Sequence, residues 1–176
     1  YKDQGTSTKP KIALERFSAV GTGPMCTALK AADVSYTLVT QFSHDRLWMM
    51  EQHCQRWGPH PISIAVLTNK TACSIHQELT AMGCFSAQKY ISVQTLSSLQ
   101  DSSSQLADYP VNVLRNMALT KVQTSHVAYV DVDFWESTDL HTNLMRDHVR
   151  HALAMDSKAA LVLPAFMMLR QCREIR

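Results

Sequence analysis

The sequence lacks a strong charge bias, a long apolar run and a recognisable leader. Its 17 Lys and Arg nearly balance 15 Asp and Glu, and the net charge of +2 is dispersed along the chain. So weak a positive field gives no argument for nucleic-acid binding. No apolar run approaches the roughly 18–20 residues that span a bilayer, and no signal peptide is visible. Because the chain begins at Tyr1 rather than Met, we expect it to be a piece of a longer protein.

Glycine and cysteine motifs are also missing. Five glycines and no GxxxxGK provide no phosphate-cradling loop. The five cysteines contain no CxxC and no Cys/His zinc spacing, and their odd count leaves one thiol over if disulfides form. Cys73 and Cys84 flank a predicted helix and are candidates for a disulfide, although buried free thiols fit the sequence equally well. Asn69-Lys70-Thr71 is a glycosylation sequon in a predicted loop and hints at a secretory lumen.

What is present is a regular alternation of strand and helix patterns. With 176 residues, of which 45% are hydrophobic and 18% charged, the chain suits one globular domain with a real core. Residues 1–33 are irregular and are expected to form a linker or stem, with a short strand at 12–17. The expected strands are 34–41, 62–68, 89–96, 126–134 and 159–166; the expected helices are 43–58, 72–83, 109–123 and 139–155, with a polar loop at 97–108.

This alternation predicts an α/β fold with a mostly parallel, doubly wound sheet over residues 34–176. Ligands bind such sheets beyond the carboxyl ends of the strands. The stretch HVAYVDVDFWES (126–137) places Asp131 and Asp133 at the carboxyl end of the fourth long strand. The sequence therefore predicts a functional site around these two aspartates.

Two carboxylates spaced i, i+2 on a strand point to the same face, where they would repel. Three arrangements make this pairing tolerable. The two groups share a proton as an acid/base dyad, or an Arg or Lys caps them in an ion network, or they hold a hard divalent cation. Mg²⁺ and Mn²⁺ take one or two protein carboxylates and complete their shell with water and substrate phosphate.

The predicted helix at 109–123 precedes this strand and carries polar groups on one face. Its residues Asn112, Arg115, Asn116 and Leu119 recur at helical spacing. An Arg beside an Asn suits hydrogen bonding to phosphate or ribose. The alternative is that Arg115 pairs with Asp131, or with another carboxylate, and steadies the site.

Three stretches of the sequence resemble glycosyltransferase family 49, which includes the LARGE-type glucuronyltransferases and beta-1,4-glucuronyltransferase 1. They are FSHDRLWMMEQHCQRWGPHPISIAVLT, YPVNVLRNMALTKVQTSHVAYVDVDFWES and ALVLPAF, and together they cover roughly residues 35–166. The resemblance implies a GT-A (Rossmann-like) fold, a UDP-sugar donor and Mn²⁺, or Mg²⁺, as cofactor. It also implies a glycan or glycoprotein acceptor, and a Golgi membrane protein whose catalytic domain lies in the lumen and whose membrane segment is outside this chain.

The resemblance also implies roles for single residues. Asp133 matches the D-x-D aspartate that coordinates the metal, and Asp131 matches the one that contacts the ribose or the metal. Thr40 and Gln41, at the end of the first strand, match the position where GT-A enzymes hold the uracil or ribose. Glucuronic acid is the expected sugar and inversion the expected stereochemistry.

Family members continue well beyond LPAF, and that part is expected to supply the acceptor site, the catalytic base and a histidine for the metal. No catalytic residue is therefore assigned here. Two other functions fit the same residues: a fragment that binds nucleotide-sugar or metal without turnover, or another Mg²⁺-dependent enzyme that transfers phosphoryl or nucleotidyl groups. The tryptophans Trp48, Trp57 and Trp135 are interpreted as packing residues, although Trp135 is close enough to the aspartates to line a donor pocket.

Overall fold

The computed structural model describes residues 30–84, 90–97, 109–156 and 158–165. Four parallel strands form one sheet in the order β3-β2-β1-β4. The strands are β1 (Tyr36–Ser43), β2 (Ile62–Leu67), β3 (Ile91–Leu96) and β4 (His126–Tyr129). The helices are η1 (Ala31–Asp33), η2 (His44–Met49), α1 (Met50–Trp57), α2 (Ala72–Ala81), α4 (Val111–Leu119), α5 (Leu140–Leu144) and α6 (Asp147–Met155). This parallel, Rossmann-like α/β arrangement confirms the predicted fold class.

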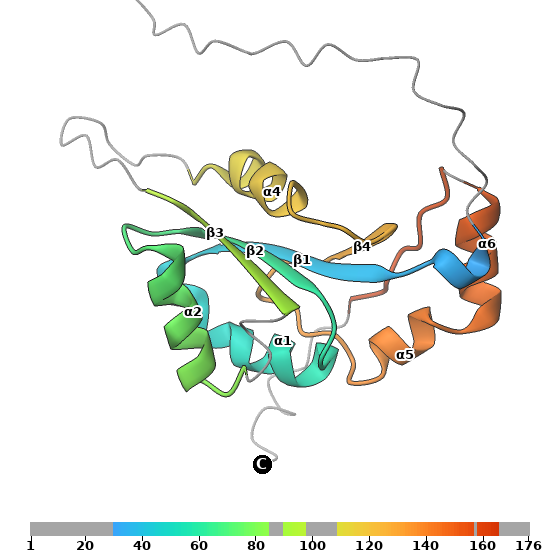
Figure 1. The fold of residues 1–176 in the computed structure, drawn as a ribbon, viewed down its shortest axis with the longest axis horizontal. Helices are drawn as coiled ribbons and strands as arrows, with labels where there is room; N and C mark the ends of the chain where they lie inside the picture. The colour runs from blue at the N-terminus through green and yellow to red at the C-terminus, as the bar shows by residue number, and fades with distance from the viewer. Residues whose placement is uncertain (1–29, 85–89, 98–108, 157, 166–176) are drawn as a thin grey trace, which may run out of the picture.

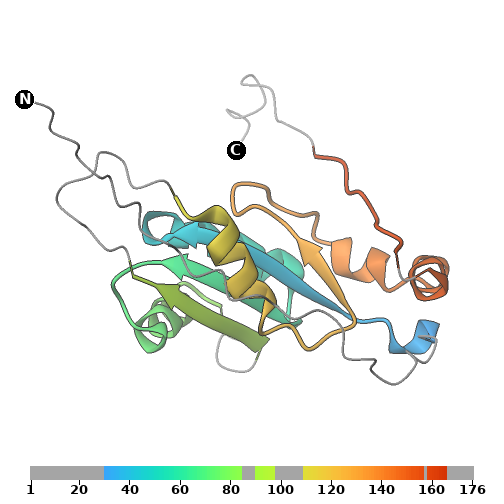
Figure 2. The ribbon, with the colours of Figure 1, turned by 90° about the horizontal axis from the view of Figure 1, so that it is seen from above.

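Helices cover both faces of the sheet (Figure 1). Figure 2, seen from above, shows α4 lying across the strands. Because successive strand residues alternate between faces, β1 sends Leu38 and Phe42 into the larger core cluster on one face. On the other face its Val39 packs against Leu114 and Ala118 of α4. The two central strands are therefore buried on both sides, which the apolar run of β2 predicts, whereas β1 also buries Thr37, Thr40 and Gln41.

Two helices end at glycines, close to the helix ends predicted from the sequence. Gly58 (φ 74°) caps α1, and Gly83 (φ 91°) follows α2. Both backbones are left-handed, a conformation that glycine adopts without a Cβ penalty. The predicted helix at 43–58 begins instead as the 3₁₀ segment η2 before α1 continues it.

The predicted helix at 139–155 is wrong as one element, because the structure breaks it into α5 and α6. Arg146 adopts extended backbone angles (φ −64°, ψ 140°) between the two helices. The break lets Leu144 and Leu153 both enter the core, and the hydroxyl of Tyr36 donates a hydrogen bond to the Leu144 carbonyl at 3.1 Å.

The predicted strand at 159–166 is also wrong, since residues 159–165 form no regular secondary structure. An extended segment needs a neighbouring strand for its backbone hydrogen bonds, and the described part of the sheet pairs none with it. The predicted segment at 12–17, most of the stem at 1–33 and nearly all of the polar loop at 97–108 lie outside the described residues. Within the described ranges, no helix has the length and apolar character needed to cross a membrane.

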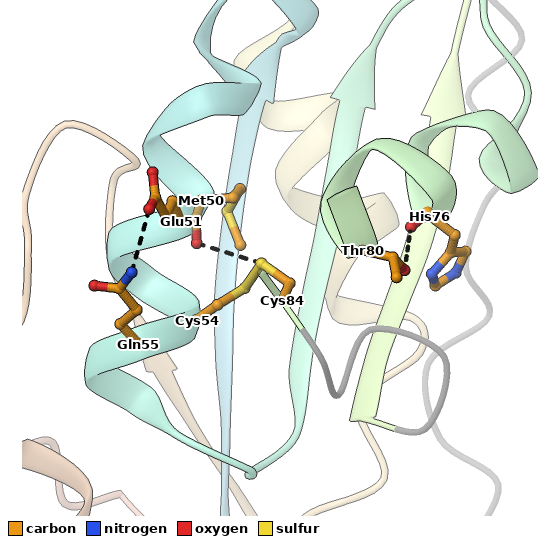
Figure 3. Close-up of a disulfide and its surroundings, with 7 residues drawn as sticks. All are labelled: Met50, Glu51, Cys54, Gln55, His76, Thr80 and Cys84. Atoms are coloured by element: carbon orange, nitrogen blue, oxygen red, sulfur yellow. Dashed lines mark hydrogen bonds between the residues drawn. A yellow bond between two sulfur atoms is a disulfide. The ribbon is translucent and has the colours of Figure 1, made fainter. Parts of the chain in front are cut away.

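A disulfide joins Cys54 of α1 to Cys84, which follows α2 (Figure 3). The proposed pairing of Cys73 with Cys84 is wrong, and Cys73 is an exposed free thiol. Helix geometry explains the error. At about 1.5 Å of rise per residue, the α2 segment separates Cys73 from Cys84 by far more than the ~7 Å Cα limit for a bridge.

Candidate functional site at the carboxyl ends of β1 and β4

Polar side chains gather where β1 and β4 end side by side. The two strands pair in parallel with Val39 opposite Tyr129. The same register, continued by the hydrogen bond from the Val130 amide to the Val39 carbonyl, brings Gln41 opposite Asp131. Parallel strands thus deliver residues 90 positions apart in the sequence to one edge of the sheet.

A hydrogen-bond network links three of these side chains. The Gln41 Nε2 donates to Asp131 Oδ1 at 3.5 Å. The Tyr129 hydroxyl lies 2.8 Å from Gln41 Oε1 and 3.0 Å from Asp131 Oδ1. Its single hydrogen can donate to only one of them at a time. Gln41 is 6% exposed, so its amide is held rigidly at the strand end.

The two aspartates lie in a turn beyond β4, which corrects the predicted strand at 126–134. The Phe134 amide donates to the Asp131 carbonyl at 2.9 Å, which closes a turn over residues 131–134. Asp131 and Asp133 are exposed, while Val132 between them is only 3% exposed and belongs to the core. The repulsion expected in a buried strand is therefore relieved by solvent, and the apolar residue between the aspartates anchors the turn.

Arg46 pairs with Asp133, with Nη1 and Oδ2 2.6 Å apart. Both side chains are about half exposed, so this exposed pair contributes little to stability. Tyr109, just before α4, lies in the electrostatic field of the same cluster. Burial raises the pKa of Tyr109 to about 12, and Asp131 adds to the rise against the opposing charge of Arg46. The Tyr109 hydroxyl therefore stays protonated at neutral pH and is available as a donor.

Arg115 of α4 lies against this network. Its guanidinium carbon lies 4.6 Å from the centroid of the Tyr129 ring, a cation–π contact. Its Nε is buried with no hydrogen-bond partner in the described part of the chain. The alternative that Arg115 pairs with a carboxylate is not observed among the described ion pairs. Asn116 lies one residue further along α4 and is exposed.

Helix α1 holds the turn from its other side. The His53 ring lies between the Glu136 carboxylate (Nδ1 to Oε2, 2.7 Å) and the Val132 carbonyl (Nε2 to O, 3.0 Å). The side chains of His53 and Glu136 are 0% and 1% exposed. Arg56 Nη1 donates to the Glu136 carbonyl at 3.1 Å, and its guanidinium carbon lies 5.9 Å from the centroid of the Trp135 ring.

Several predicted residues fall elsewhere. Thr40 is fully buried, its hydroxyl has no partner among the described residues, and strand alternation turns it away from the face that carries Gln41. The interpretation of the tryptophans holds for Trp57, which is 1% exposed. Trp48 and Trp135 are 56% and 50% exposed and so do not belong to the core, while the option that Trp135 lines a donor pocket stays a prediction.

Sequence reasoning missed Tyr129, Arg46, Tyr109 and the His53–Glu136 pair. Tyr129 had a usable signal, because it precedes Asp131 by two residues and so shares its face of the strand. Arg46 falls inside the predicted helix at 43–58, and nothing in that pattern relates it to Asp133. The His53–Glu136 pair joins residues separated by 83 positions, and no local pattern could reveal it.

The acidic pair fits a hard divalent cation by its chemistry. Both hydrogen bonds that the described side chains donate to Asp131 end on Oδ1, which leaves Oδ2 as a ligand oxygen. Mg²⁺ and Mn²⁺ need only one or two carboxylates when phosphate and water complete the shell. No cluster of three or more His, Cys, Asp or Glu suited to a metal occurs among the described residues.

The fold and the site together define a Rossmann-like α/β protein with two aspartates and two arginines at the carboxyl edge of its sheet. A profile of the family described as "Glycosyl-transferase for dystroglycan" matches residues 76–173. The human xylosyl- and glucuronyltransferase LARGE2 is 36% identical over 135 residues, which are 76% of this chain and 18% of that protein. The mouse xylosyl- and glucuronyltransferase LARGE1 is 30% identical over 149 residues, 80% of this chain and 18% of that protein. The glycosyltransferase-like protein gnt14 of Dictyostelium discoideum is 32% identical over 145 residues, 79% of this chain and 21% of that protein.

The chain belongs to glycosyltransferase family 49, in agreement with the resemblance found in its sequence. It spans about a fifth of the length of these curated relatives.

Proposed function

We propose that this chain forms the donor-binding part of a metal-dependent glycosyltransferase that transfers a sugar from a UDP-sugar to a glycan acceptor. The observation that carries the proposal is the juxtaposition of Asp131 and Asp133 with Arg46 and Arg115 at the carboxyl edge of the parallel sheet. Carboxylates hold a divalent cation, and guanidinium groups bind the oxygens of a diphosphate.

The acidic and basic side chains would have different roles in donor binding. Asp133 and Asp131 would hold Mn²⁺ or Mg²⁺, and the cation would offset the charge that develops on the departing UDP. Asp133 is paired with Arg46. If Asp133 held the cation, the Arg46 guanidinium would be free to bind phosphate oxygens in bidentate fashion.

The nucleoside would lie beside the network of Gln41 and Tyr129. The amide of Gln41 is fixed by its burial and its hydrogen bonds, so it can read the edge of a uracil or a ribose hydroxyl. Arg115, whose Nε is unpaired, and Asn116 on the next position of α4 would extend this contact to ribose or phosphate. The protonated hydroxyl of Tyr109 adds one more donor.

The relatives and the cysteines support a proposal for the transferred sugar and for the compartment. Relatives named xylosyl- and glucuronyltransferases support glucuronic acid or xylose as the transferred sugar, and the family description supports an acceptor glycan of the dystroglycan type. The Cys54–Cys84 disulfide supports an oxidising compartment, and we propose the Golgi lumen.

A binding role without turnover is the second candidate, because no third metal ligand lies close to the aspartates within the described ranges. In that case the chain would hold UDP-sugar and metal, and the transfer would require residues outside those ranges. Both candidates predict the same donor site and differ only in turnover.

Calorimetric titration of UDP into the chain tests the donor site. We expect UDP to bind at least tenfold more tightly with Mn²⁺ than with EDTA, and Asp133→Asn to remove this advantage. Asp147→Asn, which changes an exposed aspartate in the first turn of α6, is the matched control and should behave as wild type. Equal UDP affinity with EDTA, or in the Asp133→Asn variant, would contradict the proposal. A sugar-transfer assay then separates the enzyme from the binding module.

A further inference from the structure

We infer that His53 and Glu136 form a buried clamp that positions the turn carrying Asp131 and Asp133. The inference concerns two residues whose hydrogen bonds within the described ranges go to neither aspartate, and its functional consequence rests on the proposed function. The clamp joins α1 to the segment that follows β4, and its two side chains are 0% and 1% exposed. His53 acts as a positioning residue, through the backbone of the turn.

The hydrogen-bond chemistry fixes the direction of one contact. Both partners of the His53 ring, the Glu136 carboxylate and the Val132 carbonyl, are acceptors. A neutral imidazole has only one N–H, so two states satisfy both contacts. Either the ring is an imidazolium that donates to both, or a protonated Glu136 donates to Nδ1. In both states the Nε2–H of His53 donates to the Val132 carbonyl.

This carbonyl lies between the two aspartates. The turn is also closed by the bond from the Phe134 amide to the Asp131 carbonyl, and the Val132 side chain is buried. A donor that holds the Val132 carbonyl therefore sets the orientation of the peptide from which Asp131 and Asp133 diverge. Glu136, three residues beyond Asp133, holds the far end of the same segment.

The clamp has additional support from α1. Arg56, one turn after His53, donates to the carbonyl of Glu136, and its guanidinium lies near the Trp135 ring. Cys54, next to His53, ties α1 to the end of α2 through the disulfide. One short helix therefore holds the turn at several points, and is itself covalently fixed.

Four variants of the full 176-residue chain test the clamp. His53→Phe keeps a ring but cannot donate to Val132. His53→Phe/Glu136→Met replaces the buried pair by apolar side chains, which restores stability in many proteins but leaves the carbonyl unheld. Glu136→Gln keeps both contacts, since the Gln amide donates to Nδ1 while Nε2–H donates to Val132. Ile75→Val, in the core on α2, is a control for a modest loss of stability without any change at the turn.

Amide hydrogen exchange of residues 130–136, measured by mass spectrometry, reports the turn whatever the site binds. We expect exchange at least tenfold faster in His53→Phe and in the double variant, and wild-type exchange in Glu136→Gln and Ile75→Val. The Mn²⁺-dependent affinity for UDP should fall by about 10–100-fold in the first two variants only, a range typical for residues that orient metal ligands.

The double variant decides whether His53 positions the turn or only fills space in the core. If its stability recovers while its exchange remains fast, the clamp is supported. If exchange and UDP affinity both return to wild type, His53 only fills space and the inference is overturned. Should wild type bind no UDP with Mn²⁺, the proposed function fails, and the exchange result still decides whether the clamp exists. If His53→Phe alone does not fold, the double variant and Glu136→Gln carry the test.

Discussion

Removing the Cys54–Cys84 disulfide should destabilise the domain by several kilocalories per mole. The two cysteines are 30 positions apart, and closing a loop of this size removes about 12 cal/mol/K of entropy from the unfolded chain, or about 3.6 kcal/mol at 25 °C. Domains are stable by only about 5–15 kcal/mol. Loss of the bridge would therefore remove a large share of the stability.

Urea unfolding of wild type and Cys54→Ser/Cys84→Ser measures this difference. With a slope of about 1–3 kcal/mol/M, the midpoint should fall by more than about 1 M. Adding a thiol reductant should lower the wild-type midpoint toward that of the variant and leave the variant unchanged. Cys73→Ser, which changes the exposed free thiol, should match wild type. Equal midpoints for wild type and the double variant would refute the reasoning.

Three further predictions concern the site and its surroundings. Arg46→Gln should change the free energy of unfolding by less than about 1 kcal/mol, because its pair with Asp133 is half exposed, yet weaken Mn²⁺-dependent UDP binding about tenfold by calorimetry; a large stability loss with unchanged binding would contradict this. Tyr129→Phe should cost about 1 kcal/mol in urea unfolding, since it removes the hydroxyl bound to Asp131 while the ring beneath the guanidinium remains. Burial, and then the charge of a neighbouring histidine, lowers the pKa of His141 to about 4. An unfolded histidine takes its proton near pH 6.5, so stability should fall as the pH drops from 6.5 toward 4. The contribution of His141 should be about 1 kcal/mol after allowance for solvent screening, so the drop should be smaller by about that amount in His141→Phe, where the lowered pKa values of His60 and His76 still contribute.

The order of strands and helices could be predicted from the sequence because the patterns that indicate each element are local. The buried runs around Val39 and Ile64 read as central strands, and Gly58 marks the end of α1. The break between α5 and α6 could not be predicted from the sequence. It depends on Tyr36, more than 100 positions earlier, whose hydroxyl bonds to the Leu144 carbonyl.

Only part of the candidate site could be predicted from the sequence. Gln41 and Asp131 were each placed at the carboxyl end of a predicted strand, and the structure joins them by a hydrogen bond that the sequence reasoning did not foresee. Helical spacing placed Arg115 on the polar face of α4, but its contact with the Tyr129 ring is a tertiary feature. The ion pair of Arg46 with Asp133 depends on how η2 leaves the sheet, a tertiary feature that no spacing in the sequence encodes.

The disulfide shows how a local argument can mislead. Cys73 and Cys84 are closer in sequence than Cys54 and Cys84, but α2 holds the first pair at opposite ends of a helix. The Cys54–Cys84 disulfide links α1 to the end of α2 on one face of the sheet. Only the packed structure brings these two sulfur atoms together.

Binding of Mn²⁺ measured by electron paramagnetic resonance tests the central claim most directly. Free aqueous Mn²⁺ gives a sharp signal that disappears on binding, so the number of bound ions per chain can be counted with and without UDP. We predict one Mn²⁺ per chain in wild type with UDP present, and none in Asp131→Asn/Asp133→Asn. Mn²⁺ binding that is equal in the two proteins, or absent from wild type with UDP, would contradict the assignment of the two aspartates as the metal-holding pair of a glycosyltransferase.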